Sequence, residues 1–220
     1  MKPSVSVIVP GYNASQYITH AMESILVQRQ VLVELILVND GGTDNTNEVI
    51  APDRDRIVYI EQENKGLSAA RNVGFRASTG EFICFLDADD LLLPDKFERQ
   101  LRKFDEEPDL GVVISGYHIV DADGTTVIST VHKPWDRDGL QRLLNHEVFP
   151  PHAALVRREV LERSSLFPEN IDTYESQEDW QLWLDLALDG VQFGSVVEPL
   201  VKSLVSEKKG VGEKAMGELK

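Results

Sequence analysis

The chain has 220 residues, with 37 acidic side chains against 22 basic ones and a formal net charge of −15. Because the chain is acidic and has no dense Lys/Arg cluster, it lacks the basic surface that binds a nucleic-acid backbone, so we expect no nucleic-acid partner. An apolar fraction of 42% disfavours disorder, collagen and coiled coil. No apolar run reaches the ~20 residues that span a bilayer, which predicts a cytoplasmic location and leaves peripheral membrane association open.

The first 90 residues alternate between strand-like runs and helical patterns. Residues 5–9 predict a strand that ends at Pro10-Gly11, and helical spacing predicts a helix over 17–28, capped by Asn13 or Ser15. Further predicted elements are strands at 35–38, 57–60 and 81–86 and a helix at 67–77. This alternation favours an α/β fold: a Rossmann-like, mostly parallel central sheet with helices on both faces and ligands at the carboxyl ends of the strands.

The second half of the chain has a more mixed pattern. Strands at 111–117 and 126–131 flank Asp121-Ala122-Asp123-Gly124, which has the composition of a hairpin turn. The other predictions are helices at 95–104, 140–145, 158–164 and 179–188 and a closing strand at 191–197. We therefore expect a small mixed C-terminal subregion. The tail at 206–220 has few apolar residues and is expected to be mobile.

Two carboxylates follow the apolar run 82–86. If this segment stays extended, Asp87 and Asp89 point to one side and Ala88 points away. Such oxygen ligands suit Mg²⁺ or Mn²⁺, whereas a structural zinc site would need a Cys/His cluster. Surface turns also produce Asp-x-Asp pairs, but the position after a buried strand favours a cation site. Asp90 is expected to cap the following helix.

Polar residues also follow the other predicted strands. Tyr12 and Asn13 come after the first strand, where the ring could stack on a nucleobase, and Asp40 could accept a hydrogen bond from a base edge. Arg71 could face a phosphate near a helix start that offers free N–H groups. Each residue alone also fits a turn, a packing contact or a solvated arginine, so only the combination points to a nucleotide site.

Four segments in this order resemble the family-2 glycosyltransferases of the GT-A fold, which are inverting and use nucleotide sugars. They are Val5-Ser6-Val7-Ile8-Val9-Pro10-Gly11-Tyr12-Asn13, Val38-Asn39-Asp40-Gly41-Gly42-Thr43-Asp44, Gly66-Leu67-Ser68-Ala69-Ala70-Arg71-Asn72 and Phe85-Leu86-Asp87-Ala88-Asp89-Asp90. The likeness is strong over residues 4–100 and looser to about 200. Asn39 and Gly42 depart from the family pattern, but Asp40 is retained, so base binding is expected.

The resemblance implies a single domain over 1–205, with a nucleotide-binding half at 1–90 and an acceptor-side half at 91–205. It also implies roles for individual residues. Those expected to bind the nucleotide sugar are Pro10, Tyr12, Asn13, Asp40, Arg71, Asp87 and Ala88. Asp89 is expected to bind the metal, and Asp179 is expected to be the catalytic base. The residues expected on the acceptor side are His152, Glu178 and Trp180. Trp183 is expected in the core.

The predicted reaction moves a sugar from a nucleotide-diphosphate sugar, expected to be UDP-linked, to a hydroxyl of a sugar, lipid-linked or glycan acceptor. Inversion with Mn²⁺ or Mg²⁺ is expected, as in the synthesis of cell-surface polysaccharide or glycoconjugates. Two alternatives stay open: a noncatalytic nucleotide-sugar-binding module, and a nucleotidyltransferase. The second would carry a Gly-rich basic loop after the first strand, which Pro10-Gly11-Tyr12-Asn13 lacks. The shared motifs do not identify the sugar.

Overall fold

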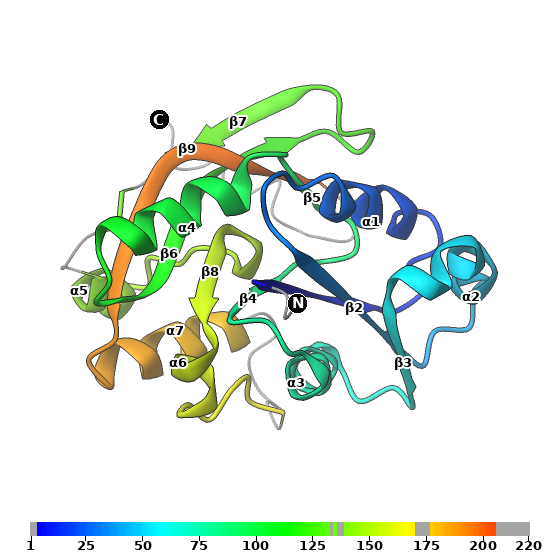
Figure 1. Cartoon of the computed structure of the whole chain (residues 1–220), viewed down its shortest axis with the longest axis horizontal. Helices are drawn as coiled ribbons and strands as arrows, with labels where there is room; N and C mark the ends of the chain where they lie inside the picture. The colour runs from blue at the N-terminus through cyan, green and yellow to red at the C-terminus, as the bar shows by residue number, and fades with distance from the viewer. Residues whose placement is uncertain (1–3, 133, 136–138, 170–176, 206–220) are drawn as a thin grey trace.

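The computed structural model describes residues 4–132, 134–135, 139–169 and 177–205, and the predicted mobile tail at 206–220 lies outside them. The described residues form a nine-stranded sheet in the order β3-β2-β1-β4-β8-β6-β9-β5, with β7 paired to β6. Helices cover both faces of this sheet (Figure 1). The predicted α/β fold class is confirmed.

The N-terminal strands are all parallel. They are β1 (Val5–Gly11), β2 (Val33–Asp40), β3 (Val58–Gln62) and β4 (Phe82–Phe85). Every residue of β1 is buried, as expected for a central strand that helices cover on both sides. Because parallel strands end at the same edge, the turns after β1, β2 and β4 meet there. Tyr12 and Asp87 lie in these turns, and Asp40 is the last residue of β2.

The rest of the sheet is mixed. It contains β5 (Leu91–Leu92), β6 (Leu110–Val120), β7 (Val127–Val131), β8 (Ala154–Arg157) and β9 (Gln192–Leu204). Strand β8 runs antiparallel to both of its neighbours, β4 and β6, and β6 and β7 form the predicted hairpin. The closing strand is longer than predicted and lies between β6 and β5, because it pairs along nearly the whole of β6.

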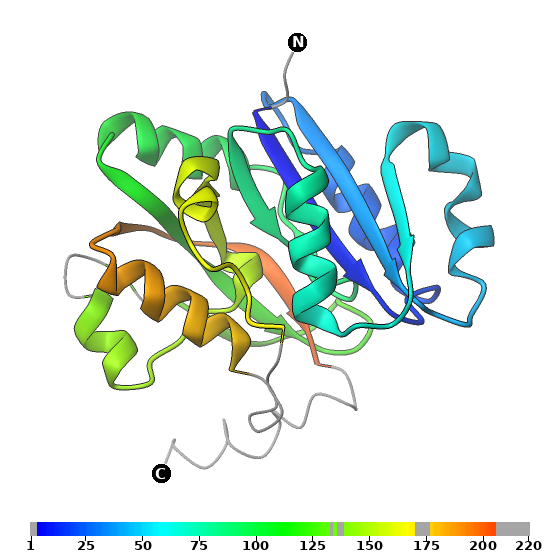
Figure 2. The same ribbon diagram turned by 90° about the horizontal axis from the view of Figure 1, so that it is seen from below.

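The helices divide between the two faces according to the alternation of side chains along the strands. In β1, Val5, Val7 and Val9 face one helical layer and Ile8 faces the other. The first layer holds α1 (Ile18–Leu26), α2 (Thr46–Ile50) and α4 (Lys96–Glu106); the second holds α3 (Leu67–Ala77), α5 (Gly139–Leu144), α6 (Arg158–Glu162) and α7 (Glu178–Leu188). Figure 2 looks onto the face covered by α3 and α7. Short 3-10 helices occur at η1 (Ala51–Arg56) and η2 (Pro151–Ala153).

Helix α3 lies close against the sheet. A Cβ atom added at Gly74 would stand 2.4 Å from Cγ2 of Ile8, so only glycine permits this approach. The helix has the predicted bounds, and its first turn reaches the edge of the sheet where the polar turns meet. In the same layer Trp183 is fully buried and stacks on Phe149 with ring centroids 4.8 Å apart, which confirms its predicted core position.

The start of α1 differs from the prediction. Tyr17 occupies the N-cap, and no side chain caps the helix. Asn13 Oδ1 instead accepts hydrogen bonds from the backbone N–H groups of Thr43 and Asp44, at 2.7 and 3.2 Å, and the Ser15 N–H donates to Asp44 Oδ2 at 2.9 Å. Tertiary contacts therefore satisfy these polar groups, and the turn after β1 is joined to the turn after β2.

Candidate active site

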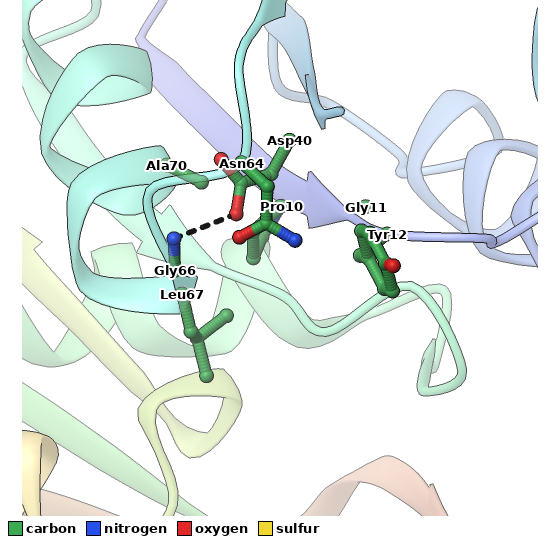
Figure 3. A pocket seen from close by; sticks show the side chains of 8 residues that line it. All are labelled: Pro10, Gly11, Tyr12, Asp40, Asn64, Gly66, Leu67 and Ala70. Carbon is green, nitrogen blue, oxygen red and sulfur yellow. Dashed lines mark hydrogen bonds between the residues drawn. The ribbon is translucent and has the colours of Figure 1, made fainter. Parts of the chain in front are cut away.

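A cavity of about 240 Å³ opens at the carboxyl ends of β1 and β2. Figure 3 shows its wall, with Tyr12 and Leu67 on opposite sides of the view. It is lined by Pro10, Gly11, Tyr12, Asp40, Asn64, Gly66, Leu67 and Ala70. Tyr12 is 56% exposed, so its ring is open to a ligand.

Asp40 shapes this cavity by holding the loop between β3 and α3. Its Oδ1 accepts from Gln62 Nε2 at 2.7 Å and from the Lys65 N–H at 2.9 Å, and its Oδ2 accepts from the Gly66 N–H at 2.9 Å (Figure 3). Gly66 has a φ of +88°, a backbone conformation that glycine adopts without strain. Asp40 is 4% exposed and is one of the residues that line the cavity.

A second and larger cavity, of about 980 Å³, shares Pro10, Tyr12 and Leu67 with the first. Its wall includes the predicted residues Asn13, Asp87, Ala88 and Asp89. The Asp87–Asp90 segment is a turn and not an extended strand, since the Asp90 N–H donates to the Asp87 carbonyl at 3.0 Å. Consequently Ala88 lines the same cavity as its two acidic neighbours and does not point away from it.

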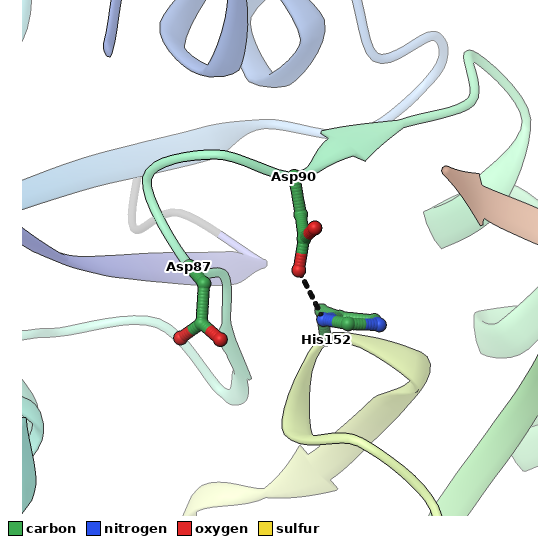
Figure 4. A group of neighbouring side chains, drawn as sticks. All are labelled: Asp87, Asp90 and His152. Carbon is green, nitrogen blue, oxygen red and sulfur yellow. Dashed lines mark ion pairs between the residues drawn. The ribbon is translucent and has the colours of Figure 1, made fainter. Parts of the chain in front are cut away.

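Asp90 does not cap a helix, contrary to the prediction. It is fully buried, its Oδ1 accepts from the Leu204 N–H at 3.0 Å, and its Oδ2 lies 2.6 Å from Nδ1 of His152. Figure 4 shows Asp90 pointing from the loop after β4 to the imidazole of η2. Strand β5 follows Asp90 directly, so the carboxylate ties this loop to β9 and η2.

His152 is expected near the acceptor; the structure places it in η2, beside Asp90 of the loop after β4. It is 3% exposed, and it is not among the residues that line a further cavity, of about 320 Å³, to which Asp179 contributes. One ligand atom from each of Asp87, Asp90 and His152 lies within 4.8 Å of the others, a spacing that a metal ion could use. The direct contact between Nδ1 and Oδ2 already occupies the space between two of these groups, so an ion would have to replace it.

A buried polar network holds η2 in place. The carbonyl oxygen of Ala153 accepts from Lys96 Nζ at 3.1 Å, Gln100 Nε2 at 2.9 Å and Ser115 Oγ at 3.3 Å. Burial lowers the pKa of Lys96 to about 8. Because Ala153 follows His152, these contacts from α4 and β6 also fix the imidazole that binds Asp90.

Arg71 joins the loop after β4 to helix α7. It is 2% exposed; Nη2 donates to Asp87 Oδ1 at 2.8 Å, and Nη1 donates to Glu178 Oε1 at 2.9 Å. Burial by itself lowers the pKa of Arg71, but the two carboxylates raise it above the ordinary value. The guanidinium therefore holds two acidic side chains in place, and its expected position near the nucleotide stays a prediction.

Asp179 follows Glu178 in the first turn of α7. Burial, followed by the adjacent charge of Glu178, raises the pKa of Asp179 to about 6, and the N–H of Trp180 and the charge of Arg71 oppose this rise. The side chain lines a third cavity of about 320 Å³, together with Trp180 and His146. A carboxylate with such a pKa is ionised at neutral pH and basic enough to accept a proton.

The structure brings most of the predicted residues together at one edge of the sheet. Pro10, Tyr12, Asn13 and the Asp87–Asp89 turn share the large cavity, and Asp40 lines the adjoining one. Asp179 lines a separate cavity and is connected to Asp87 through Glu178 and Arg71. Sequence reasoning missed the Asp90–His152 contact and the buried Lys96 and Gln100, because nothing in their local pattern signals a partner far along the chain.

A family model described as glycosyl transferase family 2 matches residues 6–164 of this chain. The chain belongs to this family. An uncharacterized glycosyltransferase of Nostoc sp. is 36% identical over 195 residues, which cover 82% of this chain and 56% of that protein. TuaG of Bacillus subtilis, which carries the name of a teichuronic acid biosynthesis glycosyltransferase, is 38% identical over 138 residues, 60% of this chain and 54% of TuaG. The chain thus spans about half the length of these family-2 relatives.

Solved structures with low sequence identity share the fold. Staphylococcus aureus TarS 1–349, in complex with UDP-GlcNAc, has a TM-score of 0.77 and 22% identity, covering 97% of this chain and 61% of that one. The mannosyltransferase PcManGT from Pyrobaculum calidifontis, in complex with GDP-Man and Mn²⁺, has a TM-score of 0.70 and 21% identity. The match covers 95% of this chain and 59% of the PcManGT chain. Within the described part of this family-2 chain, no helix combines the length and the apolar character needed to cross a membrane.

Proposed function

We propose that this family-2 chain transfers a sugar from a UDP-linked donor to an acceptor hydroxyl, with inversion at the anomeric carbon. The observation that carries the proposal is the position of the Asp179 carboxylate. Its pKa is about 6, and Glu178 and Arg71 connect it to Asp87, whose turn lines the 980 Å³ cavity. Inverting transfer requires a base on one side of the reacting carbon and charge neutralisation on the other.

The base of the donor is assigned to the 240 Å³ cavity. The exposed ring of Tyr12 offers a stacking surface, and Leu67 supplies an apolar wall. Asp40 Oδ2 accepts one hydrogen bond, from Gly66, and a carboxylate oxygen has two lone pairs, so it can also accept an N–H from a base edge. The UDP-GlcNAc bound to TarS supports uracil as that base.

The diphosphate is assigned to the larger cavity beside Asp89. Without a cation, an anionic diphosphate would face Asp87 and Asp89 in a chain whose formal net charge is −15. The carboxylate oxygens there are suitable ligands for Mn²⁺ or Mg²⁺, and a bound cation would neutralise charge on the leaving diphosphate. The complex of PcManGT with GDP-Man and Mn²⁺ supports this choice. Asp87, oriented by Arg71, is assigned to the ribose side of the donor.

Asp179 is the proposed general base. Positioned base catalysis is typically worth ~10²–10⁴ in rate, so its loss should nearly abolish transfer while the donor still binds. The name of TuaG supports the synthesis of a cell-surface polysaccharide or glycoconjugate as the context of the reaction, with a sugar, lipid-linked or glycan acceptor.

The test is the release of UDP from a panel of UDP-sugars with Mn²⁺, compared between wild type and Asp179→Asn. Asp189→Asn is the matched control, because it makes the same change at the other end of α7. Calorimetry with UDP and Mn²⁺ measures donor binding in all three proteins. We expect UDP to bind to each protein and turnover to be lost only in Asp179→Asn.

Two results would contradict the proposal in different ways. If no UDP-sugar or UDP binds in the presence of Mn²⁺, the donor assignment is wrong. If UDP binds and turnover is equally absent or equally present in wild type and Asp179→Asn, the base assignment is wrong, and absent turnover favours a noncatalytic binding module.

A further inference from the structure

The cavity that Asp179 lines is formed by two segments far apart in sequence. The connection between α5 and η2 contributes His146, Val148 and Pro150, and the start of α7 contributes Gln177, Asp179 and Trp180. The cavity measures about 320 Å³, near the lower end of the range for small-molecule sites. Its size suits one small ring and not an extended chain.

Two stacked rings form part of its wall. The ring centroids of Trp180 and His146 are 4.9 Å apart, and their planes are inclined by 22°. The indole Nε1 donates to the Leu143 carbonyl at 2.8 Å, which holds the tryptophan ring in its stacked orientation. The only polar atom of the indole is thus already satisfied, so what Trp180 offers a ligand is apolar surface.

The position of His146 is also built into the fold. Its backbone has a φ of +57°, and its N–H donates to the Leu143 carbonyl at 3.0 Å. The next residue, Glu147, donates its N–H to the Arg142 carbonyl at 2.9 Å and forms an ion pair with the Arg142 side chain at 2.9 Å. These contacts hold the turn after α5, so the imidazole reaches Trp180 without ordering a flexible loop on binding.

The polar side chains of this cavity are the amide of Gln177, the carboxylate of Asp179 and the imidazole of His146, which is stacked on Trp180. Among its lining residues in the described part of the chain there is no lysine or arginine. A negatively charged ligand would therefore meet the carboxylate of Asp179, with Glu178 close by, and no lysine or arginine of the described wall would neutralise it. A ligand with an apolar face and several hydroxyl groups matches both the rings and the acceptors at Gln177 and Asp179.

We infer that this cavity is the acceptor subsite and that it binds an uncharged sugar ring, whose apolar face packs on the His146–Trp180 pair. The inference rests on the proposed function, since it uses Asp179 as base. A hydroxyl oxygen of this ring forms the new bond to the anomeric carbon of the donor and gives its proton to the Asp179 carboxylate. The bond from the anomeric carbon to the diphosphate oxygen breaks, and its electron pair leaves with the UDP.

The test measures the binding of simple sugars by saturation-transfer NMR, using methyl glucoside, methyl galactoside and methyl N-acetylglucosaminide. Methyl glucuronide and glycerol 3-phosphate are the anionic comparators. The variants are His146→Ala and Trp180→Phe, and Leu144→Ala is the control because it is 51% exposed, adjacent to the site and not part of its wall. UDP affinity with Mn²⁺ is measured for every protein.

We expect at least one uncharged glycoside to bind and its affinity to fall about tenfold in His146→Ala, as expected for the loss of one aromatic contact. Trp180→Phe should retain part of the affinity, and Leu144→Ala should match wild type. The subsite is overturned if the anionic comparators bind as well as the glycosides, if the loss is equal in Leu144→Ala, or if a protein that binds UDP binds none of the glycosides. Failure to bind UDP contradicts the donor assignment and not the sugar subsite.

Discussion

Arg71 donates a hydrogen bond from Nη2 to Oδ1 of Asp87 at 2.8 Å, from a guanidinium that is 2% exposed. The other end of the same guanidinium binds Glu178, the neighbour of the proposed base. One buried cation therefore links the turn after β4 to the first turn of α7. Since β4 and α7 belong to the two proposed halves of the domain, this contact fixes Asp87 relative to the start of α7, which carries the proposed base.

Arg71→Met should destabilise the fold by about 3 kcal/mol, because it leaves two partly buried carboxylates without their cation. Urea unfolding measures the loss. Arg76→Met is the matched control: it lies on the same helix, its side chain is 56% exposed, and its contact with Glu169 is long, at 3.9 Å. That control should change stability by less than about 0.5 kcal/mol. Equal effects of the two substitutions would show that the buried ion pairs contribute nothing.

The activity should fall as the pH drops below about 6, because Asp179 must lose its proton to act as a base and its pKa is about 6. Glu178→Gln removes a negative charge that raises this pKa, so the acid limb of kcat/KM should move to lower pH. Asp189→Asn, at the far end of α7, should leave the limb in place. If the acid limb of kcat/KM stays at the same pH in Glu178→Gln, the charge of Glu178 does not raise the pKa of Asp179.

Asp89→Ala should weaken the Mn²⁺-dependent binding of UDP about tenfold or more, because the diphosphate would lose its cation in an acidic cavity. His152→Ala should leave that dependence on Mn²⁺ in place, since His152 is already bonded to Asp90. Asp123→Ala, in the exposed hairpin turn, is the control. Calorimetry across a Mn²⁺ series distinguishes the sites. Loss of the Mn²⁺ response in His152→Ala alone would place the ion at the Asp87–Asp90–His152 cluster.

Lys96 should make the stability of the fold depend on pH. Its folded pKa, about 8, is lower than the ordinary 10.5, so the unfolded chain binds more protons between these values and stability rises with pH across this window. The gain between pH 7 and 9 should be about 1 kcal/mol. Above pH 9 the raised pKa of Cys84, about 11, works in the opposite direction.

Lys96→Met should lack this rise between pH 7 and 9 and should still fold, because Gln100 and Ser115 continue to donate to Ala153. Lys103→Met, on the same helix beside Glu107, should follow the wild-type curve. Unfolding in urea at several pH values makes the comparison. Parallel curves for wild type and Lys96→Met would mean that the buried amine titrates as it does in the unfolded chain.

Local patterns predicted the elements of this fold well. The spacing of small and apolar residues placed helix α3 at its observed bounds, and the Asp/Gly-rich turn located the β6–β7 hairpin. Local signals failed where a polar group had a distant partner. Asn13, Ser15 and Asp90 all look like helix caps in the sequence, but each is engaged by another segment. Capping preference is weak, and a hydrogen bond or ion pair with a distant segment overrides it.

The sequence by itself determined the alternation of strands and helices and the positions of the polar turns, because side-chain periodicity and turn chemistry act over a few residues. Only the tertiary structure decided that β8 pairs antiparallel with β4 and so brings His152 to Asp90, and that Arg71 is buried between Asp87 and Glu178. Such contacts depend on which strands pair and how closely helices approach the sheet. These are properties of the packed whole chain, and no local pattern encodes them.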